Sequence, residues 1–237
     1  MSRKTTLWCG ICSETELQPK LAAVKKNIIF TISAVAWIIA VGAGLAKVLR
    51  YENTPGLSEQ TPPDWPRGTH LPQPTGRPSL LLFAHPRCPC TRATMSELAR
   101  VLAQCQGKLD ASVIFFSPQN SEPDWTQTEL RREAAAIPGV RVLDDKDGQE
   151  ARRFGAETSG QAMLYDPSGH LLFSGGITAA RGHEGDNAGS DAILALVKSG
   201  RAALTKTPAF GCSLLEAKAT ANSGVKSTGI AQCKFKL

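Results

Sequence analysis

A run of twenty residues without charge, Asn27 to Ala46, most constrains how this chain can fold. It is rich in Ile, Val, Ala and Leu, and Lys26 and Lys47 close it on either side. As a helix rising 1.5 Å per residue it is about 30 Å long, which is the hydrocarbon thickness of a bilayer. A buried core helix is seldom apolar on every side over such a length. We therefore predict a transmembrane helix over residues 27–48.

A cleaved signal peptide is the alternative, with Gly44-Leu45-Ala46 as a small-residue cleavage site. Its charged region of 26 residues and its apolar core of 20 residues both exceed the usual signal-peptide lengths. A retained anchor is therefore favoured.

Positive charge flanks the apolar run unequally. Residues 1–26 hold five Lys or Arg residues, whereas Lys47 and Arg50 follow the run. The positive-inside rule then makes residues 1–26 a cytoplasmic tail and places the chain after residue 50 outside the cytoplasm. We expect a single-pass protein of the inner (cytoplasmic) membrane with an extracytoplasmic, periplasmic domain, where cysteines can be oxidised.

The net charge of +6 does not indicate a nucleic-acid partner. Residues 1–26 carry +3 and residues 203–237 carry +4, so residues 27–202 carry −1. A nearly neutral body with basic ends has no electrostatic footprint for nucleic acid.

The rest of the chain divides by composition. Residues 49–78 are Pro-rich, with seven prolines after residue 51, and we predict an extended stalk that packs no core. Residues 79–202 alternate strand and helix patterns and form the predicted domain. Residues 203–237, rich in small residues and Lys, are expected to be a poorly ordered C-terminal extension.

The patterns within the domain predict an α/β fold with a final antiparallel hairpin. Apolar runs predict strands at 79–84, 111–116, 140–143, 162–165 and 170–173, the last two joined by a Pro- and Gly-containing turn. Helical spacing or composition predicts helices at 91–104, 125–136, 148–154 and 190–199.

The first predicted strand runs into a cysteine-bearing turn ahead of an amphipathic helix. This segment resembles the active site of the thioredoxin superfamily: Phe83-Ala84-His85-Pro86-Arg87-Cys88-Pro89-Cys90. Residues 151–156 and 162–169 resemble the closing half of TlpA/ResA-type proteins, which are membrane-tethered thiol-disulfide proteins. The segments 173–178 and 181–187 are similar to the RedB-like group.

The resemblance implies a thioredoxin-like fold, a central mixed sheet flanked by helices. It also implies thiol-disulfide redox activity, with Cys88 as nucleophile, Cys90 as its partner and an external dithiol or disulfide protein as client. No organic cofactor is implied. Independently, a cysteine at a helix N-terminus faces unpaired N–H groups that favour the thiolate, and the adjacent Arg87 adds positive charge.

Two features depart from that family. The spacing is C-x-C instead of C-x-x-C, so a Cys88–Cys90 disulfide is feasible but strained and easily reduced. Two alternatives follow for Cys212, which stands after Gly211. Its segment folds back over the site, so that Cys212 competes with Cys90 for Cys88, or it belongs to a loose tail and pairs with nothing. The family's cis-proline should fall near Gly160-Gln161, where no proline stands, which questions broad activity on protein clients.

Two other functions use the same residues. Cys88 and Cys90 with His85 or His183 could form a Cu(I)-binding or copper-delivery site, since thiolates select soft metals. A thiol peroxidase would use one cysteine beside Arg87 or Arg181.

The polar loop Arg181 to Asn187 is either a solvated surface turn or lies beside Cys88 with His183 as acid, base or ligand. Cys105 lies on the apolar face of its predicted helix and is expected to be a buried hydrophobe. Cys9 and Cys12 imitate a thioredoxin motif without a preceding strand, and we expect a coincidence or a small thiol or metal site. Cys233 is given no role.

Overall fold

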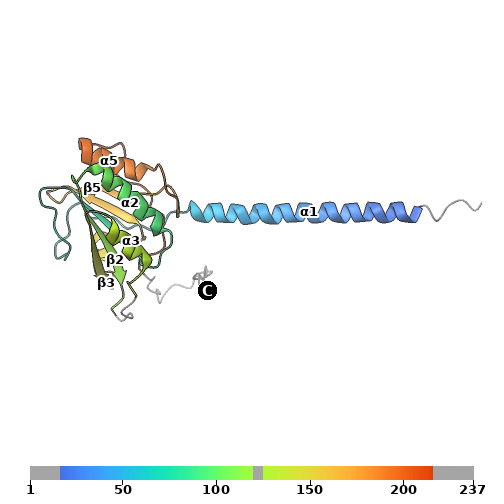
Figure 1. Ribbon diagram of the computed structural model, residues 1–237, viewed down its shortest axis with the longest axis horizontal. Helices are drawn as coiled ribbons and strands as arrows, with labels where there is room; N and C mark the ends of the chain where they lie inside the picture. Colours follow the sequence, from blue (N-terminus) through green and yellow to red (C-terminus); the bar gives the residue numbers. More distant parts are fainter. Residues whose placement is uncertain (1–16, 120–124, 216–237) are drawn as a thin grey trace, which may run out of the picture. The chain divides into compact units, whose positions relative to one another are not determined.

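The computed structural model describes residues 17–119 and 125–215, in two compact units divided after Tyr51. The described part of the first unit lies within helix α1 (Leu17–Glu52), one continuous helix (Figure 1). Its 29-residue segment Val24–Glu52 is long and apolar enough to cross a membrane by length and composition, the single such helix among the described residues. The predicted helix over 27–48 is confirmed, and α1 extends beyond it at both ends.

The second unit has a thioredoxin-like arrangement of one mixed sheet and flanking helices (Figure 1). Strands β1, β2 and β3 are parallel, β4 pairs antiparallel with β1, and β5 pairs antiparallel with β4. The strand order is β3-β2-β1-β4-β5. The elements in chain order are β1 (Ser79–Ala84), α2 (Thr91–Cys105), β2 (Asp110–Ser117), α3 (Glu129–Ala136), β3 (Val140–Lys146), α4 (Gln149–Phe154), β4 (Gln161–Tyr165), β5 (Leu171–Gly176) and α5 (Ala188–Ser199).

The central strand β1 is buried on both faces, as its uninterrupted apolar sequence predicts. Leu80 and Leu82 join the core formed with α2, α3 and α5, while Leu81 and Phe83 point into the opposite core. The amphipathic α2 and α5 cover the first face side by side (Figure 1).

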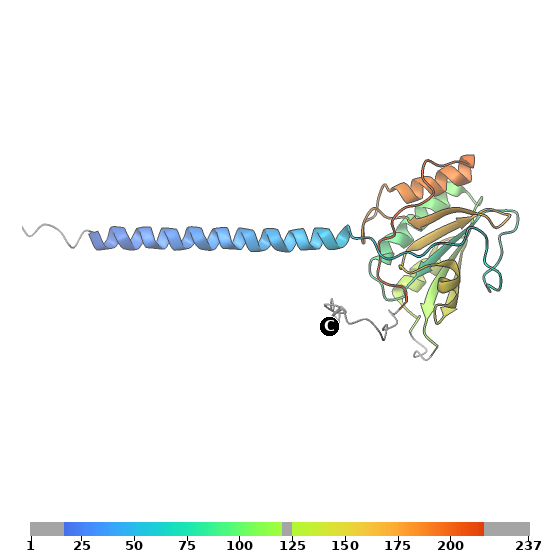
Figure 2. The ribbon, with the colours of Figure 1, turned by 180° about the vertical axis from the view of Figure 1, so that it is seen from behind.

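The second face is covered by the short helix α4 and by parts of the chain that the sequence did not predict to be ordered. The predicted Pro-rich stalk is the main correction. Trp65 packs edge-on against Phe154 and Tyr165, with ring centroids 5.2 and 5.1 Å apart, and Leu71 is buried in the same core. The segment crosses the face opposite α2 and α5 (Figure 2). A six-residue α4 is too small to cover this apolar face, so the Pro-rich segment packs there instead of forming a free stalk.

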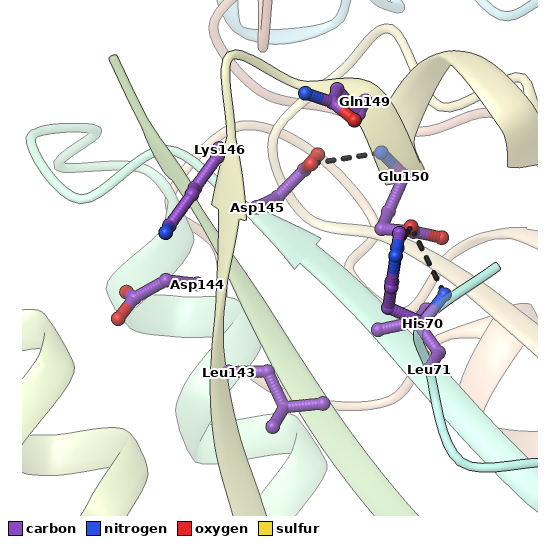
Figure 3. A pocket seen from close by; sticks show the side chains of 8 residues that line it. All are labelled: His70, Leu71, Leu143, Asp144, Asp145, Lys146, Gln149 and Glu150. Carbon is purple, nitrogen blue, oxygen red and sulfur yellow. Dashed lines mark hydrogen bonds and ion pairs between the residues drawn. The ribbon is translucent and has the colours of Figure 1, made fainter. Parts of the chain in front are cut away.

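Polar contacts fix the same segment to α4 around a pocket of about 360 Å³ (Figure 3). The buried Glu150 carboxylate accepts hydrogen bonds from the Thr69 hydroxyl and the His70 backbone N–H and forms an ion pair with Arg153. Asp145, at the end of β3, accepts from the backbone N–H groups of Glu150 and Ala151 and so begins α4.

The chain after α5 is a second correction. Residues 203–215 return along the domain, and Ala209, Phe210 and Leu214 are buried in it. The prediction of a poorly ordered extension is therefore wrong for this stretch. Residues 216–237, with Cys233, lie outside the described residues, as do Cys9 and Cys12.

Candidate functional site

The site begins where β1 ends. The Cys88 backbone N–H donates to the His85 carbonyl at 3.1 Å, and the Thr91 N–H donates to the Cys88 carbonyl at 3.2 Å. These bonds form a tight turn that places Cys88 just ahead of α2, which begins at Thr91. Cys90 is the capping residue of α2 and its side chain makes no capping hydrogen bond. Cys88 therefore lies beside the positive end of a helix, as the sequence predicts.

Cys212 reaches this turn through a short pairing with the loop that precedes β4. The Ser159 N–H donates to the Cys212 carbonyl at 2.9 Å, and the Leu214 N–H donates to the Glu157 carbonyl at 2.7 Å. A side chain at Gly211 would place its Cβ 1.8 Å from the Ser159 carbonyl oxygen. Only glycine allows this close approach. Residues 210–214, hereafter the Cys212 segment, thus fold back over the site and bring Cys212 to Cys88.

Three sulfur atoms meet there. The Sγ atoms of Cys88 and Cys212 are 3.0 Å apart and share a hydrogen bond. The Sγ atom of Cys90 completes a group in which all three atoms lie within 4.8 Å of one another. The cysteines are free, with Cys88 only 3% exposed and the other two half-buried.

The contacts divide charge unequally among the three thiols. Hydrogen bonds from Cys212 and then Cys90 hold the pKa of Cys88 far below its ordinary value, although burial opposes this. The hydrogen bonds with Cys88 and Cys90, together with burial, raise the pKa of Cys212. A hydrogen bond with Cys212 favours the thiolate of Cys90, but its contact with Cys88 and its burial outweigh this and raise its pKa. The direction of these shifts favours negative charge on Cys88 over Cys90 and Cys212.

Two buried hydroxyl groups support the turn. The Ser159 Oγ accepts from the His85 N–H at 2.8 Å and shares a hydrogen bond with the Thr91 Oγ1 at 2.7 Å. Ser159 thus links the Cys88 turn, α2 and the Cys212 segment. It directly precedes Gly160, where the family's cis-proline was sought, and the described residues contain no cis peptide bond. Ser159 and Thr91 were not predicted as site residues, although Thr91 directly follows Cys90 and Ser159 shortly precedes the predicted strand 162–165.

The loop after β5 contributes an arginine to the site. The Arg181 guanidinium donates to the Gly211 carbonyl, and its charge is a minor influence that favours the Cys90 thiolate. The loop is tied to α2 through the buried Glu97 carboxylate, which accepts from the Gly185 N–H at 2.7 Å. Arg181, one of the two arginines of the peroxidase alternative, is thus hydrogen-bonded to the segment that carries Cys212.

Neither predicted histidine belongs to the sulfur group. The His85 ring stacks on Phe116, with centroids 5.8 Å apart, and its Nδ1 accepts from the Arg87 N–H at 3.2 Å. The Arg87 guanidinium lies 3.9 Å from the centre of the Trp125 ring. His183 lies 3.6 Å from the Glu52 carboxylate. The predicted metal site of two cysteines with His85 or His183 is therefore not assembled in this structure.

Cys105 is buried at the end of α2, as the sequence predicts, and burial raises its pKa. It packs in the core with α5 and lies outside the sulfur group.

Comparison with known proteins shows similarity in structure and none in sequence families. No protein-family model matches the chain, and no curated protein matches it. A hypothetical protein from Sinorhizobium meliloti 1021 is 22% identical, with a TM-score of 0.50 over 68% of this chain and 93% of that one. An uncharacterized conserved protein from Geobacillus kaustophilus is 18% identical, with a TM-score of 0.51 over 69% of this chain and 94% of that one.

A secreted Mycobacterium tuberculosis disulfide oxidoreductase is also 18% identical, over 52% of this chain and 82% of that one, with a TM-score of 0.37. The strand order, the parallel and antiparallel pairings and the cysteine turn between β1 and α2 agree with the resemblance seen in the sequence. The chain has a thioredoxin-like fold.

Proposed function

We propose that this chain is a membrane-anchored thiol-disulfide oxidoreductase, with Cys88 as the reactive thiolate and Cys212 as the thiol that resolves its adducts. The 3.0 Å separation of the Cys88 and Cys212 sulfur atoms carries this proposal. Disulfide formation needs a sulfur–sulfur distance of about 2.05 Å, so the two atoms need to approach by only about 1 Å.

The exchange proceeds in two steps. The Cys88 thiolate attacks one sulfur of a partner disulfide, forms a mixed disulfide and releases the other partner sulfur as a thiolate. The Cys212 thiol then loses its proton and attacks the Cys88 sulfur, which forms the Cys88–Cys212 disulfide and releases the second partner thiolate. The partner gains two electrons, and the protein's dithiol loses them. The same steps in reverse oxidise a partner dithiol.

Cys90 has a different part in this scheme. A Cys88–Cys90 disulfide closes a small strained ring, whereas Cys212 arrives from a separate segment and needs no such ring. We assign the stable oxidised state to Cys88–Cys212 and a more easily reduced state to Cys88–Cys90. Both partners are within reach, since all three sulfur atoms lie within 4.8 Å.

The apolar part of α1 supplies the anchor. The five positive residues within 1–26 favour an N-terminus in the cytoplasm of the inner membrane and a domain outside it. An extracytoplasmic compartment suits the proposal, because disulfides form and persist there.

The test oxidises the full chain, in detergent, with oxidised glutathione and maps its disulfides by mass spectrometry. We expect a Cys88–Cys212 cross-link in the unmodified chain and in Cys90→Ser. Cys212→Ser should form the more easily reduced Cys88–Cys90 disulfide instead. The double variant Cys90→Ser/Cys212→Ser should accumulate a Cys88–glutathione adduct, and Cys88→Ser should lose exchange. Cys105→Ala is the matched control, since it changes a thiol outside the site. Folded protein that forms no disulfide through Cys88 would overturn the proposal.

A second measurement follows the charge of Cys88. The rate of alkylation of Cys88 by iodoacetamide, in Cys212→Ser and in the unmodified chain, is measured between pH 6 and 9. An ordinary thiol with a pKa of about 8.5 reacts about tenfold more slowly for each pH unit below that value. We expect a flatter profile for Cys88 in the unmodified chain and a steeper one without Cys212. Identical profiles in both would remove the role assigned to Cys212.

A further inference from the structure

The three sulfur atoms also form a ligand set of one chemical kind. Cys88 and Cys90 come from the turn before α2, and Cys212 comes from a segment more than a hundred residues later in the chain. In the described part of the chain this is the one group of three or more cysteine, histidine or acidic ligand atoms gathered closely enough to hold a metal ion.

The geometry fits a trigonal metal centre. A metal–thiolate bond is about 2.3 Å long, so three sulfur atoms around one ion lie about 4 Å apart. In the observed group the sulfur atoms of Cys88 and Cys212 are 3.0 Å apart, and every pair lies within 4.8 Å. For Cys88 and Cys212 this means a change of about 1 Å in the sulfur–sulfur distance.

The donor set decides which metal suits the site. Structural zinc is held by four ligands in a tetrahedron, and this group offers three. Calcium and magnesium require oxygen ligands, which are missing from the group. Three thiolates without imidazole or carboxylate select a soft ion, and Cu(I) is the common one.

The surroundings offset part of the negative charge. Three thiolates around Cu(I) carry a net charge of −2. The Arg181 guanidinium bonded to the Gly211 carbonyl and the N-terminus of α2 both face this end of the domain.

We propose that the reduced chain binds one Cu(I) ion through the sulfur atoms of Cys88, Cys90 and Cys212, with no histidine ligand. Binding releases the remaining thiol protons and transfers no electrons. Formation of the Cys88–Cys212 disulfide removes two of the three ligands, so the metal-bound and oxidised states exclude each other. The inference does not rest on the proposed exchange activity, because it needs only the reduced thiols.

The test uses the full chain in detergent with Cys9, Cys12 and Cys233 replaced by serine, so that thiols outside the described residues do not bind copper. The reduced protein is titrated with Cu(I), without oxygen, against the chelator bathocuproine disulfonate. We expect one equivalent of Cu(I) to bind, and Cys88→Ala, Cys90→Ala and Cys212→Ala each to lower the affinity at least tenfold. Cys105→Ala and His183→Ala should leave the affinity unchanged, and circular dichroism shows that each variant is folded.

X-ray absorption identifies the ligands directly. Three sulfur neighbours and no nitrogen support the site. Two sulfur neighbours, a nitrogen neighbour or an affinity unaffected by Cys212→Ala would overturn it. Tighter binding of Zn(II) than of Cu(I) would overturn the choice of metal. Disulfide mapping with glutathione is run on the same samples, so loss of copper binding and loss of exchange are seen separately.

Discussion

The substitution Gly211→Ala tests how the Cys212 segment is held against the site. Gly211 does not have a positive φ, so alanine is compatible with its backbone conformation and the change tests only the contact. The added Cβ would lie 1.8 Å from the Ser159 carbonyl oxygen. Ordinary contact distances are about 3.5 Å, so the segment must move by more than about 1 Å.

The expected loss in the free energy of unfolding can be estimated from the contacts that hold the Cys212 segment. Its two backbone hydrogen bonds, from Ser159 to Cys212 and from Leu214 to Glu157, contribute about 1 kcal/mol each. The buried Leu214 side chain contributes about 1.5–3 kcal/mol. We expect Gly211→Ala to weaken these contacts in part and so to lower the free energy of unfolding by about 2–3 kcal/mol.

The same displacement should change the chemistry of the site. Cys88 is 3% exposed beneath its neighbours, so lifting the Cys212 segment exposes it. We expect Cys88 alkylation to accelerate at least tenfold and the oxidised chain to contain Cys88–Cys90 in place of Cys88–Cys212.

Pulse proteolysis in urea measures the free energy of unfolding of the full chain in detergent, and peptide mapping identifies the disulfide. Ser213→Ala is the matched control, because it changes an exposed side chain beside Cys212 and removes one exposed hydrogen bond, to the Leu215 carbonyl. It should lower stability by no more than about 1 kcal/mol. Unchanged stability together with an unchanged Cys88–Cys212 cross-link in Gly211→Ala would refute this account of the segment.

Three further predictions test the rest of the structure. Trp65→Ala should lower the free energy of unfolding by about 2–3 kcal/mol in urea denaturation, less than a fully buried Trp because the ring is half-buried, whereas a free stalk would show no effect. For Glu150, burial alone would raise the pKa, but hydrogen bonds from Thr69 and His70 leave it below its ordinary value. Its stabilising contribution is therefore present above that ordinary value and is lost as the pH falls through the lowered one. The urea midpoint of the unmodified chain should thus fall more steeply from about pH 5 to pH 3 than that of Glu150→Gln, and parallel curves would contradict this. An alkaline phosphatase fused after residue 237 should be active, since it requires export, and activity of a strictly cytoplasmic reporter at that position would reverse the topology.

The sequence predicted the elements whose signals are local. The apolar run that became α1 and the buried run that became β1 needed only hydrophobicity and length to be recognised. The cysteine turn was also local, because a strand, two prolines and a helix stand in consecutive order around Cys88.

The boundaries of strands and helices were harder to predict where contacts with other residues determine them. The strand predicted at 140–143 continues to Lys146 because Asp144, Asp145 and Lys146 pair with β2, although charged residues seldom indicate a strand. The helix predicted from residue 125 begins at Glu129, where the Thr128 side chain accepts from the Arg131 N–H.

Only the tertiary structure decided what the Pro-rich and C-terminal segments do. A high density of proline or of small residues predicts a segment that does not pack against a core, because such a pattern reports only on the segment itself. Whether the Pro-rich segment packs depends on the area of apolar sheet that α4 leaves uncovered, and no local sequence pattern contains that information. The meeting of Cys212 with Cys88 was decided in the same way. Their sulfur atoms come together because Gly211 lets one backbone approach Ser159 closely, and that contact joins residues far apart in the chain.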